Sequence, residues 1–457
     1  MTVAATRTKA EQALSQNFEA VAAKLPGGRA VAEARKAAIG AFAALGLPHR
    51  RIEAWKYTDL RGALKEALPP AAGEAGKVAA QDIDAALEEL AALDAYRVVF
   101  IDGAHDAALS AVAGAKGLEV SSLAAALTKS GDRAGDGLIR ESAPGQEAVI
   151  ALNTAFMTDG AIVRIAKGAR LDKPLLLVFV RAAKLGRLVT TRNLIRVGAC
   201  ARATVIEAHV ALADAAPGQA NALSEVELGD GAHLTHLACT LAGGAASHLA
   251  TWLATLGQET TYRAFQLTAG TGLARNSTFA TFRGEGAKLD ISGLFLGRGG
   301  EHIDTTLVVD HAVPRCESRE LFKGVLADRA RGVVQGKVIV RPDAQKSDGK
   351  QMAQVLMLSE DAEFDSKPEL EIHADDVICG HGSTAAELDP DLLFYMRARG
   401  IPIEEARALL IESFIGEAID KIEDERLREA LFGLARRRLA QLAGARAQAP
   451  QAQRRRT

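Results

Sequence analysis

The chain has 457 residues, of which 48% are hydrophobic, and a formal net charge of -2 from 55 basic and 57 acidic residues. This length allows two or three domains with a sizeable core, and the charge balance gives no reason to expect nucleic acid or an anionic membrane as a partner. The four cysteines are scattered without a Cys-x-x-Cys pair, which excludes a zinc ribbon or ferredoxin-type site held by this chain alone and favours a reducing cytoplasm.

Residues 1–145 predict an N-terminal domain of helices and mixed segments. The stretches 9–25 and 30–46 are rich in alanine and carry apolar residues at three- and four-residue spacing, as amphipathic helices do. The first residues, MTVAATRTKAEQALSQNF (1–18), have no uninterrupted apolar core and are typical of an amphipathic helix, so we expect no signal peptide. A charged and aromatic stretch, RRIEAWKYTDLRG (50–62), follows, and the Pro/Gly-rich residues 69–76 predict a loop.

Residues 146–386 predict a β core. Short apolar runs alternate with turns rich in Gly, Asp and Asn, and a loose motif of strand end, turn, alanine and polar strand recurs in IAKGARLD, VELGDGAHLT, VRPDAQKS and LSEDAEFD. This repetition favours a β-solenoid, while its variable period leaves a β-sandwich open. A doubly wound α/β fold is disfavoured because no helical pattern lies between the strands.

Helical patterns return in residues 387–443, which predict a C-terminal helical domain. Asp389 is placed to cap a first helix that ends at Gly400. A second helix spans 401–422, and its apolar stripe comprises Ala406, Leu409, Leu410, Phe414 and Ile415. The tail 444–457 has almost nothing to bury, so we expect it to be disordered.

Motifs for several common chemistries are missing from the sequence. There is no Gly-x4-Gly-Lys-Ser/Thr, no strand followed by Gly-x-Gly-x-x-Gly and a helix, and no His-Glu-x-x-His. The chain should therefore not hydrolyse nucleotides through a P-loop. His233 and His236 are three residues apart, which on a strand puts them on opposite faces and favours structural roles for both.

The segment ELEIHADDVICGH (369–381) is rich in side chains that can bind metal. If the segment is one extended strand, alternate side chains face the core: Leu370, Ile372, Ala374, Asp376 and Ile378. The opposite face then carries Glu371, His373, Asp375, Val377, Cys379 and His381. Cys379 and His381 would be neighbours on that face, roughly 6–7 Å apart along the strand.

Two ligands are too few for a complete site, because structural zinc and iron–sulfur clusters use about four. The pattern alone leaves three interpretations of Cys379 and His381 open. They belong to a site completed by another chain, or they are a half-buried thiol and a turn-capping imidazole, or they form a catalytic dyad. The pattern favours the second, and the dyad has least support because no third orienting group is evident.

Three stretches resemble the SufB/SufD family of iron–sulfur cluster assembly proteins. They are EAWKYTDLR (53–61), GKVIVRPDAQKSDGKQMAQVLMLSEDAEFDSKPELEI (336–372) and ADDVICGHGSTAAELDPDLLFYMRARGI (374–401). The first stretch and the Cys-x-His-Gly form around His381 favour the SufD branch over the SufB branch. His373 stands where relatives usually carry an aromatic residue, so the resemblance assigns it no role.

The resemblance implies a right-handed parallel β-helix between helical domains, acting as a scaffold without catalysis of its own. It implies pairing with SufB through the β-helices, with Cys379 and His381 as ligands to iron or a nascent cluster held transiently at that interface. It further implies a SufC ATPase docked on the C-terminal helices, for which Leu409, Leu410 and Phe414 are candidates. The same three side chains could instead pack against the chain's own β core.

Two alternatives remain beside this scaffold. One is a SufB-like paralogue, which the Cys-x-His-Gly form and the N-terminal stretch disfavour. The other is a β-solenoid enzyme acting on carbohydrate, a class that combines paired carboxylates with an aromatic-lined cleft. Aromatic residues make up only 4% of the chain, which argues against the enzyme.

Overall fold

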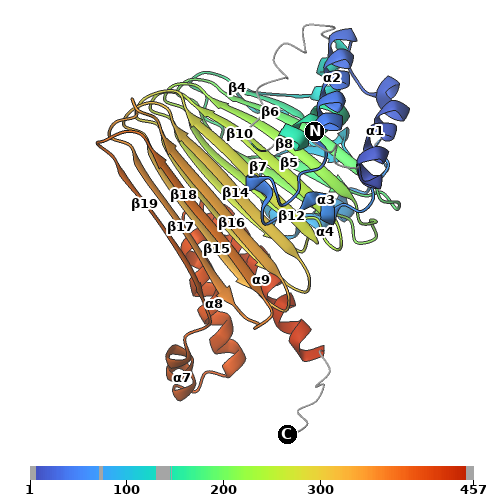
Figure 1. Ribbon diagram of the computed structural model, residues 1–457. Coiled ribbons are helices and arrows are strands. Elements are labelled where there is room, and N and C mark those ends of the chain that lie inside the picture. The colour runs from blue at the N-terminus through green and yellow to red at the C-terminus, as the bar shows by residue number, and fades with distance from the viewer. Residues whose placement is uncertain (1–6, 72–75, 130–144, 146, 449–457) are drawn as a thin grey trace, which may run out of the picture.

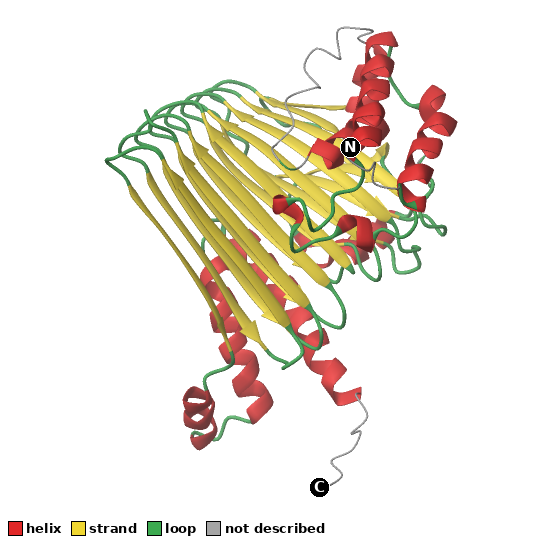
Figure 2. Ribbon diagram, in the orientation of Figure 1, coloured by secondary structure: helices red, strands yellow, loops and turns green. Residues whose placement is uncertain are grey.

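The computed structural model describes residues 7–71, 76–129, 145 and 147–448, with side chains up to residue 441. The chain winds into a β-solenoid of about eight turns, flanked by helical N- and C-terminal regions (Figures 1 and 2). The predicted β-solenoid is therefore confirmed. The predicted domain boundaries stay predictions, and residues 449–457 of the expected disordered tail lie outside the described part.

Two long sheets form the solenoid. In spatial order the first sheet contains β2 (Ala104–Ala111), β1 (Tyr96–Ile101), β5 (Leu175–Arg181), β7 (Arg202–Ala211), β9 (His233–Leu241), β11 (Thr261–Ala269), β13 (Lys288–Gly297), β15 (Glu317–Leu326), β17 (Asp348–Met357) and β19 (Ile378–Ala386). The second sheet contains β3 (Leu118–Ser122), β4 (Ala161–Ile165), β6 (Leu188–Val197), β8 (Gln219–Leu228), β10 (Ser247–Leu256), β12 (Leu273–Phe282), β14 (His302–His311), β16 (Arg331–Val340) and β18 (Glu363–Ile372).

Helices lie on the outer faces of both sheets. The N-terminal ones are α1 (Lys9–Val21), η1 (Ala22–Lys24), α2 (Arg29–Leu45), η2 (Glu53–Trp55), α3 (Leu60–Ala63), α4 (Ala80–Leu87), η3 (Glu88–Ala92), α5 (Leu123–Lys129) and α6 (Glu147–Phe156). The C-terminal ones are α7 (Pro390–Ala398), α8 (Ile403–Ile419) and α9 (Glu425–Gln448). Among the described residues, no helix is long and apolar enough to cross a membrane.

Strand alternation divides the apolar residues between the lumen and the outer faces. Leu175 and Leu177 of β5 point into the lumen between the sheets, where the largest hydrophobic cluster lies. Their neighbours Leu176 and Val178 point outward into a second cluster shared with α4, η3, α8 and α9. Strands buried on both faces explain why their sequences are nearly continuous apolar runs.

The stretch WKYTDLR docks on the outer face of the second sheet. Trp55 is fully buried, and the guanidinium of Arg275 lies 4.0 Å from the centre of its ring. Arg275 forms a buried ion pair with Asp304, which also accepts a hydrogen bond from the hydroxyl of Thr58. Trp55 and Thr58 therefore anchor the stretch WKYTDLR on the second sheet of the solenoid.

The two ends of the solenoid are built differently. At one end β2 and β3 turn back and pair antiparallel with β1 and β4, closing the parallel order of each sheet. We call this the capped end. At the other end β18 and β19 are the outermost strands of their sheets, and both continue the parallel order. We call this the open end.

Candidate functional site

Cys379 and His381 lie on β19, the terminal strand at the open end (Figure 1). The prediction of one strand across residues 369–381 is wrong. β18 ends at Ile372, residues 373–377 form a corner, and β19 begins in the other sheet at Ile378. Because the chain changes sheets at this corner, the alternation of inward and outward side chains restarts.

The restarted alternation changes which residues face the lumen. Ile378, expected in the core, has 64% of its surface exposed. Cys379 instead packs against the edge of the lumen cluster, and burial raises the pKa of its thiol above the ordinary value. His381, two residues further along β19, belongs to the same face and is exposed. The two candidate ligands therefore share the lumen side of the terminal strand.

The neighbouring strand β17 lies beneath the two candidate ligands. Gly349 is the register partner of Cys379, and Gln351 is the register partner of His381. A Cβ atom placed on Gly349 would lie 3.6 Å from the sulfur of Cys379 and 3.4 Å from the hydroxyl oxygen of Ser318. The floor beneath the two candidate ligands is thus made of a glycine and an amide.

The other expected metal-binding side chains do not join this pair. Leu370 on β18 packs against the lumen cluster, so its neighbour Glu371 points to the outer face. There Glu371 pairs with Lys337 and, at 3.0 Å, with His373, and these contacts lower the pKa of Glu371 to about 2. Among the described residues, no three His, Cys, Asp or Glu side chains are grouped so that they could hold a metal ion. This chain presents two ligands, not a complete site.

The C-terminal helices separate into a packed half and a projecting half. The C-terminal half of α8 packs on the first sheet, where Ile415, Ala418 and Ile419 are fully buried. Phe414 is half-buried there, and the ammonium of Lys323 lies 4.2 Å from the centre of its ring. Leu410 is also half-buried, whereas Leu409 is 44% exposed. The three predicted docking residues thus lie at different depths.

Helix α7 contributes exposed apolar side chains that sequence reasoning did not single out. Asp389 caps the helix as predicted, accepting from the backbone N–H groups of Asp391 and Leu392. No residue of α7 is buried, and the exposed fractions are 49% for Leu392, 73% for Phe394 and 55% for Tyr395. The signal was available in the run LLFY, because α7 contacts α8 but has no buried residue to account for four consecutive apolar or aromatic side chains.

A buried polar network inside the solenoid was also missed. His236 donates from Nε2 to a carboxyl oxygen of Glu207 at 2.8 Å, and its Nδ1 lies at hydrogen-bond distance, 2.8 Å, from the hydroxyl of Tyr262. The ring also stacks on Trp252. Burial alone would raise the pKa of Glu207, but hydrogen bonds from His209 and His236 outweigh burial and lower it. His236 is inaccessible to solvent, which agrees with the structural role predicted for it.

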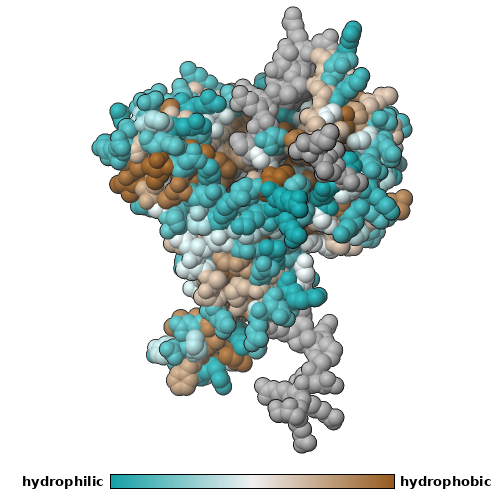
Figure 3. All heavy atoms as spheres, in the orientation of Figure 1, coloured by the Kyte–Doolittle hydropathy of each residue, from teal (hydrophilic) through white to brown (hydrophobic). Residues whose placement is uncertain are grey.

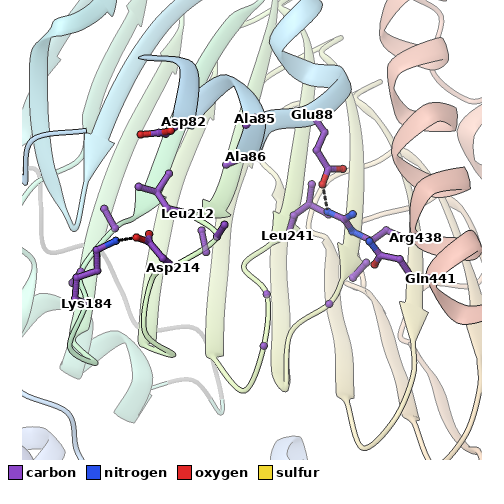
Figure 4. Close-up of a pocket in the computed structure, with 18 of the residues that line it drawn as sticks. Asp82, Ala85, Ala86, Glu88, Lys184, Leu212, Asp214, Leu241, Arg438 and Gln441 are labelled. Atoms are coloured by element: carbon purple, nitrogen blue, oxygen red, sulfur yellow. Dashed lines mark hydrogen bonds and ion pairs between the residues drawn. The ribbon is translucent and has the colours of Figure 1, made fainter. Parts of the chain in front are cut away.

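A large groove lies away from the open end. It has a volume of about 1110 Å³ and runs along the turns that follow the strands of the first sheet, between α4 and α9 (Figure 4). Two ion pairs, Glu88–Arg438 and Lys184–Asp214, line the groove. Neither Cys379 nor His381 lines this groove, so it is not part of the candidate site.

Comparisons with known proteins agree with this architecture. A family model described as "SUF system FeS cluster assembly, SufBD core domain" matches residues 179–414, and one described as "SufBD protein N-terminal region" matches residues 8–177. The chain is 32% identical to the iron-sulfur cluster assembly protein SufD of Escherichia coli, over 86% of this chain and 90% of that protein. It is also 32% identical to an iron-sulfur cluster assembly SufBD family protein of Synechocystis, over 85% of this chain and 86% of that protein.

Proposed function

The chain belongs to the SufBD family and is a SufD-type component of the SUF system for iron–sulfur cluster assembly, and from that premise we propose that it is a scaffold with two partners. Its open end pairs with a SufB protein, and its C-terminal helices dock a SufC ATPase. It has no catalytic activity of its own, since ATP hydrolysis belongs to SufC. It works in a reducing cytoplasm, which fits four free cysteines.

The observation that carries this proposal is the open end. β18 and β19 each present an unpaired strand edge, and such edges are templates for pairing with another chain. Ile372 and Ile378 beside these edges are 42% and 64% exposed. Hydrophobic side chains gather near the start of β19 in the space-filling view (Figure 3). An exposed apolar rim beside unpaired edges is suited to a protein partner.

Pairing at this end would complete the ligand set. Cys379 and His381 supply a thiol and an imidazole, the ligand types that hold iron and iron–sulfur clusters. The partner supplies the remaining ligands across the interface. Iron or a nascent cluster is cargo at this shared site, held only until transfer, and the chain keeps no tightly bound cofactor.

The ATPase dock is centred on the projecting half of the C-terminal helices. Leu392, Phe394 and Tyr395 on α7 and Leu409 on α8 form an exposed apolar surface, which we call the arm surface. Helix α7 and the adjoining half of α8 extend beyond the body of the solenoid in both ribbon views (Figures 1 and 2). Leu410 and Phe414 support this surface from the packed side, with Phe414 also serving the chain's own core.

The ligand proposal is tested in cells with the double variant Cys379→Ala, His381→Ala. Maturation of cluster-dependent enzymes should be lost, while the variant still co-purifies with SufB and SufC. The matched control is Cys200→Ala, His233→Ala, which removes the same residue types from accessible positions elsewhere on the solenoid. Normal maturation by the first variant would refute the ligand role.

The arm surface is tested by pull-down with SufC. Phe394→Asp combined with Leu409→Asp should abolish capture, because it places two charges in an apolar contact. Asp391→Ala, also on α7, is the control and should retain capture. Undiminished capture by the double Asp variant would show that SufC docks elsewhere.

A further inference from the structure

A short polar column runs inward from His381 through the last turns of the solenoid. His381 on β19 is in register with Gln351 on β17, and Gln351 is in register with Glu320 on β15. One strand further from the open end, the same position is Ile291, which is fully buried in the lumen cluster. Beneath the candidate site the column is thus polar for two strands, Gln351 and Glu320, and apolar at the next two, Ile291 and Ala264, before His236 on β9.

Gln351 bridges the two sheets under the terminal strand. Its side chain is almost fully buried, with 8% of the residue exposed. Its amide nitrogen donates to the backbone carbonyl of Glu369 on β18, at 3.1 Å. Since Gln351 belongs to the first sheet and Glu369 to the second, this bond crosses the lumen one strand below His381.

Gly336 on β16 provides the space that this bridge needs. A Cβ atom placed on Gly336 would lie only 2.0 Å from the amide oxygen of Gln351. The same point is 3.7 Å from a carboxyl oxygen of Glu320. Any larger residue at 336 would push the amide out of its place, so the glycine and the glutamine form a fitted pair.

Glu320, on the next strand below Gln351, is a polar side chain that carries no negative charge at neutral pH. Its residue is 5% exposed, and one of its carboxyl oxygens has no hydrogen-bond partner among the described residues. Burial raises the pKa of Glu320 to about 8, although a hydrogen bond from Ser318 acts in the opposite direction. A neutral acid at this depth does not draw an imidazolium or a cation inward from the rim.

We propose that Gln351 is a positioning residue for His381: it closes the lumen beneath the terminal strand and holds the imidazole toward the partner. This inference rests on the proposed function, because it assumes that His381 is a ligand at the shared interface. Strands in one sheet lie about 4.8 Å apart, so the Gln351 side chain lies directly beneath the histidine. Groups that orient a ligand in this way typically change metal affinity by about 10–100-fold.

The test uses the complex of the full chain with its SufB partner, and Co²⁺ as the probe. Gln351→Met keeps the length of the side chain but removes the amide. It should weaken Co²⁺ binding at least about tenfold and shift the visible absorption bands of the bound ion, which report ligand geometry. Gln354→Met, on the opposite face of β17, is the matched control and should leave both unchanged.

A second variant separates positioning from folding. Gly336→Ala displaces the amide without changing Gln351 or either ligand, and it should shift the Co²⁺ spectrum in the same way. Wild-type affinity and spectrum in both variants, with binding lost in Cys379→Ala, His381→Ala, would overturn this inference and leave the proposed function standing. Normal binding in the Cys379→Ala, His381→Ala complex would overturn both.

Discussion

The capped and open ends of the solenoid differ in how each sheet stops. At the capped end antiparallel strands cover the last parallel strands, and the residues behind them, such as Leu177, are fully buried. At the open end the last strands remain parallel, and no residue of β18 or β19 is buried; β2 and β3 at the capped end are almost as exposed, so the difference lies in strand direction. An outermost strand that continues the parallel order is a template for a further strand, and for this reason we place the proposed partner at the open end.

The two ends also differ in the side chains that line the lumen. At the capped end the lumen is filled with apolar and aromatic side chains, including the stacked rings of Phe100 and Phe179. At the open end the lumen side carries Cys379 and His381 above Gln351 and Glu320. The Glu207–His236 network lies deeper in the solenoid and is closed to solvent, whereas His381 is exposed at the open end, where the proposed partner would reach it.

The largest expected effect is on stability at the capped end. Leu177→Ala removes a fully buried side chain from the lumen cluster and should lower the free energy of unfolding by about 2–5 kcal/mol. Ile378→Ala at the open end should change it by less than about 0.5 kcal/mol, because that side chain is 64% exposed. Urea denaturation of the isolated chain measures both. Equal losses would mean that the open end is as well packed as the capped end.

The next effect is a pH dependence that belongs to the open end. Glu320 holds its proton in the folded chain up to pH about 8 but releases it near 4.5 when unfolded. The folded state then binds the extra proton, so stability falls as pH rises, by about 1 kcal/mol per unit. The lowered pKa values of four histidines, His233, His248, His302 and His311, act in the opposite direction, mainly at and below pH 6.5.

The window from pH 6.5 to 8 therefore isolates Glu320. Over this range the wild-type chain should lose roughly 2 kcal/mol of stability. Glu320→Gln, which cannot ionise, should lose almost none of it. Thermal or urea unfolding at a series of pH values provides the comparison. A variant that keeps the full wild-type slope would show that Glu320 is already ionised in the fold.

The smallest effect on stability is expected for Ile378→Lys, which should nevertheless weaken the association with SufB. Ile378→Lys places a charge on the exposed rim and should leave the unfolding midpoint of the isolated chain nearly unchanged. Its affinity for SufB should fall at least about tenfold, because the charge would be buried without a partner in the complex. Leu185→Lys is the control, since Leu185 is 71% exposed at a turn elsewhere. Identical affinities would place the interface away from the open end.

Much of this molecule could be predicted from the sequence. The alternation of short apolar strands with turns favoured a β-solenoid but left a β-sandwich open, and the family resemblance then implied the parallel β-helix. The Cys-x-His spacing drew attention to Cys379 and His381, but only the resemblance implied a ligand role for them. The adjacent aspartates Asp375 and Asp376 allowed a break in the strand, but not the change of sheet at residues 373–377, because period-two alternation continues smoothly through this corner. That corner decides that Ile378 is exposed and Cys379 faces the lumen.

The remaining features depend on contacts between residues far apart in the chain. Trp55 is recognisable as part of a motif, but its docking depends on Arg275 and Asp304, which only the coiling of the solenoid brings together. Likewise the column of Glu320, Gln351 and His381 exists only once the register of three strands is known. A lone glutamate in an otherwise ordinary strand gives no local signal of such a neighbour.

The central claim is that the open end supplies ligands to a site shared with SufB. The most direct measurement is an anaerobic titration of the purified complex with Fe²⁺, comparing the wild type with Cys379→Ala, His381→Ala. The account predicts that the wild-type complex binds iron with a defined stoichiometry and that the variant complex, though intact, binds it at least about tenfold more weakly. An intact variant complex that binds iron as tightly as the wild type would contradict it.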